Sequence, residues 1–427
     1  MEFNQVSELD PAWLVFTHKP MLEIWAGSIH PLGSLYECAV TMDEAGQAHT
    51  NLITALKEAG VPHVFSIPEI LSTYASKEVL VDLAARSLVY KFEGNPSILT
   101  PRELDSFSEE YKRDSVLRPK TPAELTSIIL TRPTVVLKKN SANCVLAVAS
   151  IQMYPLSNLV FSRDQQIVTP KGLVMGNLCT PQRAPESLLM RKCFEIMGVP
   201  QIGIIGSQGY EGATLEGGDF IPLGEDLAFL GVGVRTSYSA ARQLMEQDLL
   251  GARRLAVVQD LRDRSQDRMH LDTIFNVVDE RNVVVWEYAI TREDKKRVVD
   301  LYEREEGSKE YRMVKQGVDF VEFLKSEGFN VIVASDQEQI EYLINFVSLG
   351  RRKDGVIDII SVHKDLKEKL EKAGVKNVNV KFVEYRGITK MLGAAHCSTQ
   401  VFRCHKHKYD SPEFKKLSEV TFPFKKE

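Results

Sequence analysis

Residues 269–275 read Met-His-Leu-Asp-Thr-Ile-Phe, and the interpretation of the whole chain depends on them. This run predicts a strand, in which every second side chain points to the same face. His270 and Asp272 would then lie side by side, opposite Leu271. An imidazole beside a carboxylate can transfer a proton and bind a cation. A polar strand face open to water is the other interpretation of a single His-x-Asp motif, so other parts of the chain must decide between the two.

Composition places the chain among ordinary globular proteins and excludes several classes of function. The 427 residues are 44% hydrophobic and 26% charged, with a formal net charge of -5. This mild acidity, without a long Lys/Arg-rich block, argues against a nucleic-acid partner. Six cysteines without a Cys-x-x-Cys pair indicate a reducing compartment, with no disulfide framework and no zinc site. Because neither a secretory signal nor a membrane-length apolar stretch is present, we expect a cytoplasmic protein with no membrane partner.

Strands and helices alternate along most of the chain. A strand at 13–16, a helix at 43–59 and a strand at 61–65 begin the pattern. Further strands are predicted at 159–161, 166–169, 220–223, 227–230, 255–258, 283–286, 331–334, 356–360 and 378–380, and further helices at 186–197, 237–250, 318–327 and 366–373. The recurring strand-strand-helix-strand order predicts a modular α/β fold.

Residues 77–130 have a different, helix-rich texture. Helices are predicted at 79–86 and 101–112, and prolines punctuate the segment. We therefore expect a helical insertion at 77–130 within a catalytic domain that spans residues 1–427.

Two acidic motifs lie where chain turns are expected. Residues 158–164, Asn-Leu-Val-Phe-Ser-Arg-Asp, end a predicted strand at Asp164, where binding residues are often found. Residues 214–220, Thr-Leu-Glu-Gly-Gly-Asp-Phe, put two glycines between Glu216 and Asp219, so that the backbone can turn tightly beside a pocket. A surface ion pair and a plain hairpin turn are the alternative interpretations.

Two arginines and one cysteine complete the set of candidates. Arg183 and Arg235 each precede a predicted helix, where either could clamp a carboxylate or lie on the surface. Cys397 follows the small residues of Leu392–Ala395 and precedes an apolar strand. A thiolate is a strong nucleophile, although most cysteines are inert core residues.

Taken together and in this order, the motifs resemble those of the arginine deiminase family, in the guanidine-modifying or pentein superfamily. Nearly the whole chain is covered: residues 16–20 resemble the family's first strand, and residues 158–164 resemble its Asn-Leu-x-Phe-Thr-Arg-Asp. The resemblance implies a five-bladed α/β propeller of ββαβ modules around a central pocket, with the helical insertion in the place where the family inserts a helical domain.

The chemistry of the residues agrees with the resemblance. A guanidinium is a planar cation with five N–H donors. Asp164 and Asp272 can each accept a pair of these donors, which fixes the central carbon for attack by Cys397. His270 can protonate the departing ammonia and then deprotonate water, while Glu216 orients His270. No metal or other cofactor is required.

The resemblance further implies a small-molecule substrate, L-arginine, converted to L-citrulline and ammonia by a homo-oligomer, either a dimer or a tetramer. The expected substrate-binding residues are Asp164, Asp272, Asn158, Phe161, Arg183, Arg235 and Gly218.

Two positions depart from the family pattern. Leu392 stands where the family carries an arginine that meets the substrate carboxylate, and Lys390 could reach in to replace it. Gln165 stands where a proline is usual, which is somewhat like the arginine dihydrolases that continue to ornithine, CO2 and ammonia. A dihydrolase, a methylarginine hydrolase, an amidinotransferase and a non-catalytic arginine sensor therefore remain as alternatives.

Overall fold

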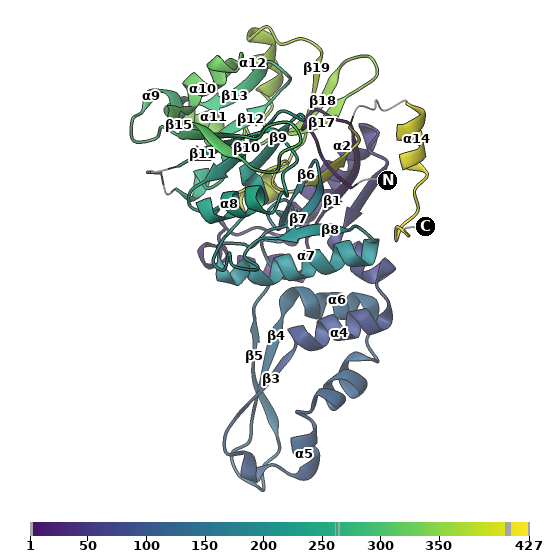
Figure 1. Cartoon of the computed structure of the whole chain (residues 1–427). Helices are drawn as coiled ribbons and strands as arrows, with labels where there is room; N and C mark the ends of the chain where they lie inside the picture. Colours follow the sequence, from purple (N-terminus) through teal and green to yellow (C-terminus); the bar gives the residue numbers. More distant parts are fainter. Residues whose placement is uncertain (1–2, 261, 264, 406–410, 426–427) are drawn as a thin grey trace.

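The computed structural model describes residues 3–260, 262–263, 265–405 and 411–425. Figure 1 shows an α/β body with an arm projecting from one side, and helix α7 (Ala184–Met197) runs along the boundary between them. In the described part of the chain, no helix is both long and apolar enough to cross a bilayer.

The body contains five sheets that share one pattern: a central strand pairs antiparallel with one neighbour and parallel with the other. The central strands are β1 (Ala12–Thr17), β7 (Gly172–Met175), β10 (Leu227–Val232), β13 (Asn282–Trp286) and β18 (Ile357–Ser361). Their antiparallel partners are, in the same order, β20 (Gln400–Arg403), β6 (Gln166–Thr169), β9 (Phe220–Leu223), β12 (Phe275–Val277) and β17 (Val347–Arg351). Their parallel partners are β2 (His63–Ser66), β8 (Gln201–Ile204), β11 (Arg254–Gln259), β16 (Asn330–Ala334) and β19 (Val378–Phe382).

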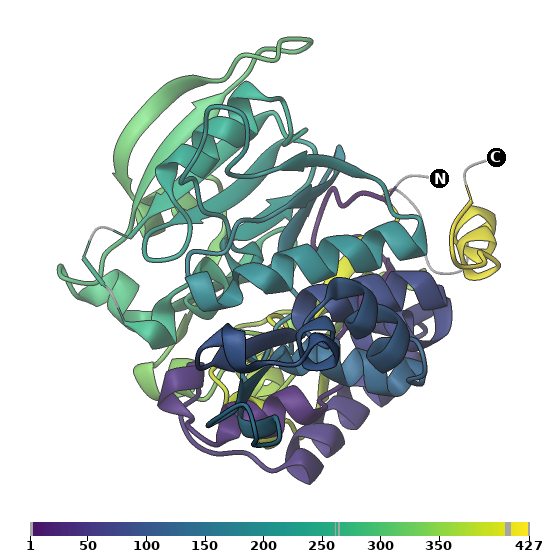
Figure 2. The same cartoon turned by 90° about the horizontal axis from the view of Figure 1, so that it is seen from below.

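A helix lies in the chain between each central strand and its parallel partner. These helices are α2 (Met42–Glu58), α7, α8 (Tyr238–Glu246), α10 (Phe320–Ser326) and α12 (Leu366–Lys372). The unit is the strand-strand-helix-strand order that the sequence predicts. One sheet is wider, because β14 (Val298–Glu303) and β15 (Arg312–Asp319) extend it beyond β11 as a long ribbon (Figure 2).

Helix α2 illustrates how local sequence specifies these elements. Thr41 and Glu44 form a capping box that satisfies the first free N–H groups of the helix. Ala45, Ala48, Leu52 and Leu56 recur at helical spacing and are buried. The helix stops before Gly60, whose φ of +83° suits glycine.

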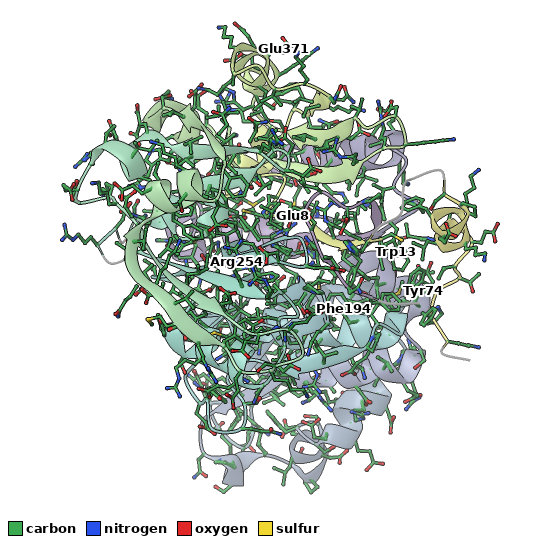
Figure 3. The ribbon with its side chains drawn as sticks, turned by 45° about the horizontal axis from the view of Figure 1, so that its top comes forward. Glu8, Trp13, Tyr74, Phe194, Arg254 and Glu371 are labelled. Carbon is green, nitrogen blue, oxygen red and sulfur yellow. The ribbon has the colours of Figure 1, made fainter. Side chains whose placement is uncertain are left out.

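The first sheet joins the two ends of the chain. Strand β1 lies between β2 and the C-terminal strand β20. Behind it, the ring of Phe16 packs at a centroid distance of 5.0 Å from Phe194 on α7 and 5.8 Å from Phe402 on β20. Trp13 and Phe194 are labelled in Figure 3. N-terminal, central and C-terminal segments therefore share one hydrophobic core.

The arm contains helices and a sheet. Its elements are α4 (Lys77–Ser87), β3 (Val89–Glu93), α5 (Pro101–Asp105), a π-helical segment Tyr111–Leu117, α6 (Pro122–Thr131), β4 (Pro133–Lys138) and β5 (Ala147–Met153). Strand β3 lies inside the segment that we expected to be helical, and the helix expected at 101–112 ends at Asp105. Burial alternates along Val89–Glu93, with Tyr90 and Phe92 less exposed than their neighbours, which is the strand period, and the strand pairs with β4.

The remaining short helices are α1 (Leu22–Ser28), α3 (Ile67–Glu69), α9 (Glu287–Thr291), α11 (Asp336–Ile340), α13 (Arg386–Thr389) and α14 (Pro412–Ser418).

Three expectations for local structure are wrong. Residues 269–275 are not a strand: His270 is extended, Leu271–Thr273 form a 3-10 turn, and β12 begins only at Phe275. Residues 159–161 also form turns, not a strand. Helix α8 ends at Glu246, four residues early, because Asp248 adopts a left-handed φ of 53°. The first two errors have different causes: polar residues two positions apart in the 3-10 turn mimic the strand period, whereas Leu159–Phe161 is a short apolar run whose pattern alone does not identify its structure.

Candidate active site

The predicted catalytic residues come from equivalent places in different modules. Each lies in the segment that enters the first strand of its module: Asp164 before β6, Glu216 before β9, His270 and Asp272 before β12, and Cys397 before β20. All five side chains are buried, and the contacts between them place these four segments around one centre.

His270 connects two of the acids. Its Nε2 lies 2.7 Å from Oε2 of Glu216, and its Nδ1 lies 3.8 Å from Oδ1 of Asp164. The turn that carries His270 is fixed by Asp219, whose Oδ1 accepts from the backbone N–H of Leu271 at 2.9 Å. Of the two carboxylates in the Glu-Gly-Gly-Asp motif, Glu216 therefore contacts the imidazole and Asp219 holds the neighbouring backbone.

Gly218 provides the space for this arrangement. A Cβ atom at Gly218 would lie 2.8 Å from Nδ1 of His270 and 3.1 Å from Oδ1 of Asp272. The two side chains that face Gly218 are thus the predicted proton carrier and one half of the predicted guanidinium clamp. Any larger residue at position 218 must displace them.

Asp272 lies next to the thiol. The Sγ atom of Cys397 is 3.7 Å from Oδ2 of Asp272, and the same oxygen is 2.7 Å from Nδ1 of His396. Asn345 fixes both backbones, because its Oδ1 accepts from the N–H of Cys397 at 3.3 Å and its Nδ2 donates to the carbonyl of Asp272 at 3.2 Å. Asn345 lies in the segment that leads into β17. Each of the five modules therefore has a residue just before its first strand that contacts this centre.

Three buried polar atoms at this centre have no hydrogen-bond partner within the described residues: Oδ1 of Asp164, Oδ1 of Asp272 and Nδ1 of His270. A buried polar group without a partner costs about 1–3 kcal/mol, and more when it is charged. Two acceptor oxygens beside a thiol form a site for a ligand that is positively charged and rich in N–H donors.

The electrostatic environment keeps His270 protonated. Burial lowers the pKa of His270, but the nearby Asp164 and the hydrogen bond to Glu216 outweigh burial and raise the pKa to about 10. Burial raises the pKa of Glu216, whereas His270 and Arg183 lower it, to a net value of about 2. Near neutral pH the pair is therefore an imidazolium beside a carboxylate, and His270 can act as an acid.

The same environment keeps Cys397 as a thiol. Burial raises the pKa of Cys397 well above its ordinary value, and the negative charges of Asp272 and Asp164 raise it further. A cation placed between the thiol and these carboxylates would offset both charges. The site is consequently arranged to ionise its cysteine when a cation enters.

The predicted carboxylate-binding residues lie around this centre, but most are engaged. Arg183 donates from Nη1 to Oδ2 of Asp164 at 2.9 Å and from Nη2 to Glu186 at 2.9 Å. The amide of Asn158 donates to the carbonyl of Ser34 at 2.9 Å.

Arg235 retains a free donor. Its Nη1 lies 3.7 Å from Glu216 and contacts Thr180, while its buried Nε has no partner among the described residues. Arg235 is therefore the best placed of the predicted residues to accept an additional anion.

The loop before Cys397 is tightly packed. Leu392 has a left-handed φ of 67°, which is unusual for a bulky side chain. A Cβ atom at the next residue, Gly393, would lie 2.3 Å from the ring of Phe161, so Phe161 packs directly against this loop. Lys390, which could replace the missing arginine, has its Nζ paired with Glu44 at 2.8 Å in this structure.

Sequence reasoning missed four residues of this region. Asn345 and His396 contact the centre directly. Behind them, Arg163 donates to the carbonyl of His396 at 2.8 Å, and the carboxylate of Glu8 lies 3.7 Å from Nε2 of His396. The signal that could have found Asn345 is the modular repeat, since it occupies the position before β17 that catalytic candidates occupy before other first strands.

Asp164, Glu216 and His270 are the one group of metal-ligating side chains, within the described ranges, whose donor atoms all lie within 4.8 Å of one another. They do not suit a resident metal. His270 is protonated near neutral pH and bonded to Glu216, and the guanidinium of Arg183 occupies Asp164. An imidazole must be neutral to bind a metal.

The family model and the curated relatives agree on one family. A family model described as arginine deiminase matches residues 33–403. The arginine deiminase of Halobacterium salinarum is 24% identical over 487 aligned positions, covering 93% of this chain and 96% of that protein. That of Streptococcus equi subsp. zooepidemicus is 22% identical, covering 86% and 89%. A DDAH structure from Pseudomonas aeruginosa with citrulline superposes with a TM-score of 0.50 at 12% identity, covering 92% and 100%, and this likeness concerns the fold alone.

Proposed function

The chain belongs to the arginine deiminase family, and from this premise we propose that it hydrolyses L-arginine to L-citrulline and ammonia through a covalent intermediate on Cys397. The observation that carries the proposal is a pair of buried oxygens, on Asp164 and Asp272, that accept no hydrogen bond from any residue the structure describes and lie beside a buried thiol. A guanidinium supplies the N–H donors and the positive charge that this arrangement lacks.

In the first half-reaction, Asp164 and Asp272 hold the guanidinium with its central carbon facing Cys397. The positive charge of the substrate lowers the pKa of the thiol, which releases its proton to solvent, and the thiolate bonds to the central carbon to give a neutral tetrahedral adduct. The C–N bond to one terminal nitrogen then breaks as His270 donates a proton, and ammonia leaves. The product of this step is a cationic amidino group bonded to sulfur.

In the second half-reaction, the now neutral His270 removes a proton from water, and the hydroxide attacks the same carbon. The C–S bond breaks as the proton of the new hydroxyl group passes to sulfur, which leaves the neutral ureido group of citrulline and regenerates the Cys397 thiol. Glu216 keeps the imidazole oriented through the 2.7 Å contact and favours its protonated form between turnovers.

For the far end of the substrate we propose Arg235 as the principal carboxylate-binding residue. Its Nε is buried and without a partner among the described residues, and a carboxylate is the anion that its guanidinium binds best. Asn158, Phe161, Arg183 and Gly218 then shape the pocket. Leu392 contributes no charge, so this chain binds the carboxylate with fewer cations than the family pattern supplies.

The experiment that tests the proposal quantifies ammonia, citrulline and ornithine separately after incubation with L-arginine. We expect one ammonia per citrulline and no ornithine. Cys397→Ser should lose activity by at least about a thousandfold, since removing a nucleophile removes the covalent route. Cys144→Ser, at an exposed cysteine in the arm, is the matched control and should keep full activity.

Two results would contradict this reading. Ornithine without citrulline would make the chain a dihydrolase, the alternative that Gln165 suggests. In this fold the Gln165 amide donates to Glu186 at 2.9 Å, which is a supporting role. Full turnover by Cys397→Ser would exclude the covalent mechanism.

We also propose that the five sheets are the blades of an α/β propeller and that the arm is an insertion within it. The support is the repeated pairing pattern and the position of the site residues before first strands. In a propeller these positions face a common axis. Replacing residues 77–153 with a short linker tests whether the arm is an insertion. We expect the body to fold without it.

A further inference from the structure

Two adjoining clefts lie where the arm meets the body, with volumes of about 410 and 380 Å³. Arg86, Ser87, Arg132 and Pro185 line both of them, so they form one continuous depression, which we term the arm cleft. Residues of α4 and α6 of the arm line one side of it and residues of α7 of the body line the other, and Figure 1 shows these three helices next to one another. Its size matches that of pockets for small organic ligands.

The floor of the arm cleft is apolar. The residues that form it are Leu83, Ile129, Leu156, Leu188 and Leu189. Leu188 keeps 69% of its surface exposed although it lies beside other leucines. An apolar surface of this kind gains free energy when the hydrocarbon part of a ligand covers it.

The charges in the arm cleft do not balance. Each of the acids lining it is already paired with another cation: Asp82 with Arg113, Glu186 with Arg183, and Glu195 with Arg191 and Lys192. Two further cations, Arg86 and Arg132, face the cleft, and within the described residues neither guanidinium forms a hydrogen bond or an ion pair. Two uncompensated guanidinium groups beside an apolar floor attract an anion.

The backbone at Arg132 is a second, independent observation. Arg132 ends helix α6 in a left-handed conformation with φ of 48°, immediately before Pro133. A left-handed residue is a common end to a helix, and Pro133 cannot continue the helix. This conformation places a partly buried guanidinium in both clefts, where burial alone lowers its pKa.

We propose that the arm cleft binds an organic anion, a carboxylate on a short aliphatic chain, with Arg86 and Arg132 contacting the charge and the leucines contacting the chain. The carboxylate matches the planar donors of a guanidinium, and an aliphatic chain of several carbons covers the apolar floor. One of the two clefts extends to Asn158 and Arg183 at the edge of the proposed substrate pocket, whereas Arg86 and Arg132 have no part in the proposed reaction.

The test is isothermal titration calorimetry of the full chain with octanoate and, separately, with inorganic phosphate. Octanoate should bind once per chain, and phosphate at least tenfold more weakly, because phosphate leaves the apolar floor uncovered. Arg132→Gln and Arg86→Gln should each weaken octanoate binding at least tenfold. Arg102→Gln removes an equivalent exposed charge from α5 of the arm, outside the cleft, and should leave the affinity unchanged.

Thermal unfolding of each variant shows whether it is folded. If Arg132→Gln does not fold, Arg86→Gln still tests the proposal, because Arg86 lies within a regular helix. Unchanged octanoate affinity in folded Arg86→Gln would overturn the proposal. Phosphate binding as tight as octanoate would also overturn it, because the apolar floor would then contribute nothing. Since binding is measured without turnover, either failure is distinguishable from failure of the proposed catalytic activity.

Discussion

At the scale of single residues, the acids that would hold a guanidinium also suppress the nucleophile. Asp272 lies 3.7 Å from the sulfur of Cys397, and its charge raises the pKa of the thiol. In the absence of a cation the cysteine is therefore protected from reaction. In the proposed mechanism, the same carboxylates orient the target carbon once a guanidinium is bound. One pair of charges thus couples reactivity of the thiol to occupancy of the site.

Asp272→Asn should separate these two effects. Loss of the negative charge lowers the pKa of Cys397, so alkylation by iodoacetamide at pH 8 should become several-fold faster than in the wild type. Turnover of L-arginine should nevertheless fall by at least about a hundredfold, because half of the guanidinium clamp is lost. Mass spectrometry of the Cys397 peptide and a citrulline assay measure the two rates. Slower alkylation in the variant would show that Asp272 does not set the pKa of the thiol.

Arg235→Gln should affect the far end of the substrate more than the guanidinium. We expect KM for L-arginine to rise at least tenfold, equivalent to about 1.4 kcal/mol or more of lost binding free energy. Agmatine, which lacks the carboxylate, serves as the matched substrate, and its KM should change little. Nη1 of Arg235 is also 3.7 Å from Glu216. A change in kcat would therefore not distinguish loss of carboxylate binding from an effect on Glu216. An equal rise in KM for L-arginine and agmatine would show that Arg235 acts on Glu216 rather than on the substrate carboxylate.

At the scale of elements, the sequence predicted which segments alternate and the turn at Gly217–Asp219, but it misassigned two segments that carry or adjoin site residues, 159–161 and 269–275. His270 and Asp272 were expected on a strand, where they would share a face. They lie instead at a 3-10 turn, and both still point to the centre because the turn brings them to Gly218. A three-residue turn has too few positions for its period to be distinguished from that of a strand. Long-range contacts, such as the one from Asp219 to Leu271, decide the outcome.

The turn at Gly217–Asp219 gives a test at this scale. In Gly218→Ala the new Cβ lies 2.8 Å from His270 and must displace it, so activity should fall at least about a hundredfold while the protein stays folded. Gly217→Ala differs, because its Cβ would lie 2.0 Å from the backbone carbonyl of Arg163, which cannot move aside.

The two neighbouring variants should therefore separate chemistry from folding. Gly217→Ala should lower the Tm strongly, whereas Gly218→Ala should lower it little. Gly46→Ala, in helix α2 with no atom within 4 Å of its Cβ, is the control and should keep full activity with a slightly higher Tm. Wild-type kinetics in Gly218→Ala would mean that His270 does not need its observed position.

At the scale of the whole molecule, the site depends on contacts between the ends of the chain, which no local pattern reveals. Glu8 lies near the middle of the body in Figure 3. Its carboxylate contacts Arg403 on β20 and lies 3.5 Å from Arg163. Both arginines adjoin segments that carry predicted catalytic residues. Arg163 directly precedes Asp164, and Arg403 follows the turn that carries Cys397. Sequence motifs identified the residue types of the site, but partners almost 400 positions apart could only be found in the fold.

Glu8→Gln tests this long-range anchor. Burial opposes ionisation of Glu8, but Arg403 and the bond to His396 outweigh it and hold the pKa of Glu8 far below its ordinary value of 4.5. A lowered pKa in the folded state stabilises the protein above about pH 4.5, and this contribution disappears as the pH falls toward the folded-state pKa. Removing the charge leaves two buried arginines poorly compensated, which should cost about 3 kcal/mol or more at pH 7.

Urea unfolding at pH 7 and at pH 3.5 measures this contribution. The free energy of unfolding should differ strongly between wild type and Glu8→Gln at pH 7, and less at pH 3.5. Glu78→Gln removes an exposed partner of Arg118 and should change neither value. A difference that is the same at both pH values would show that the charge of Glu8 does not hold the two ends of the chain together.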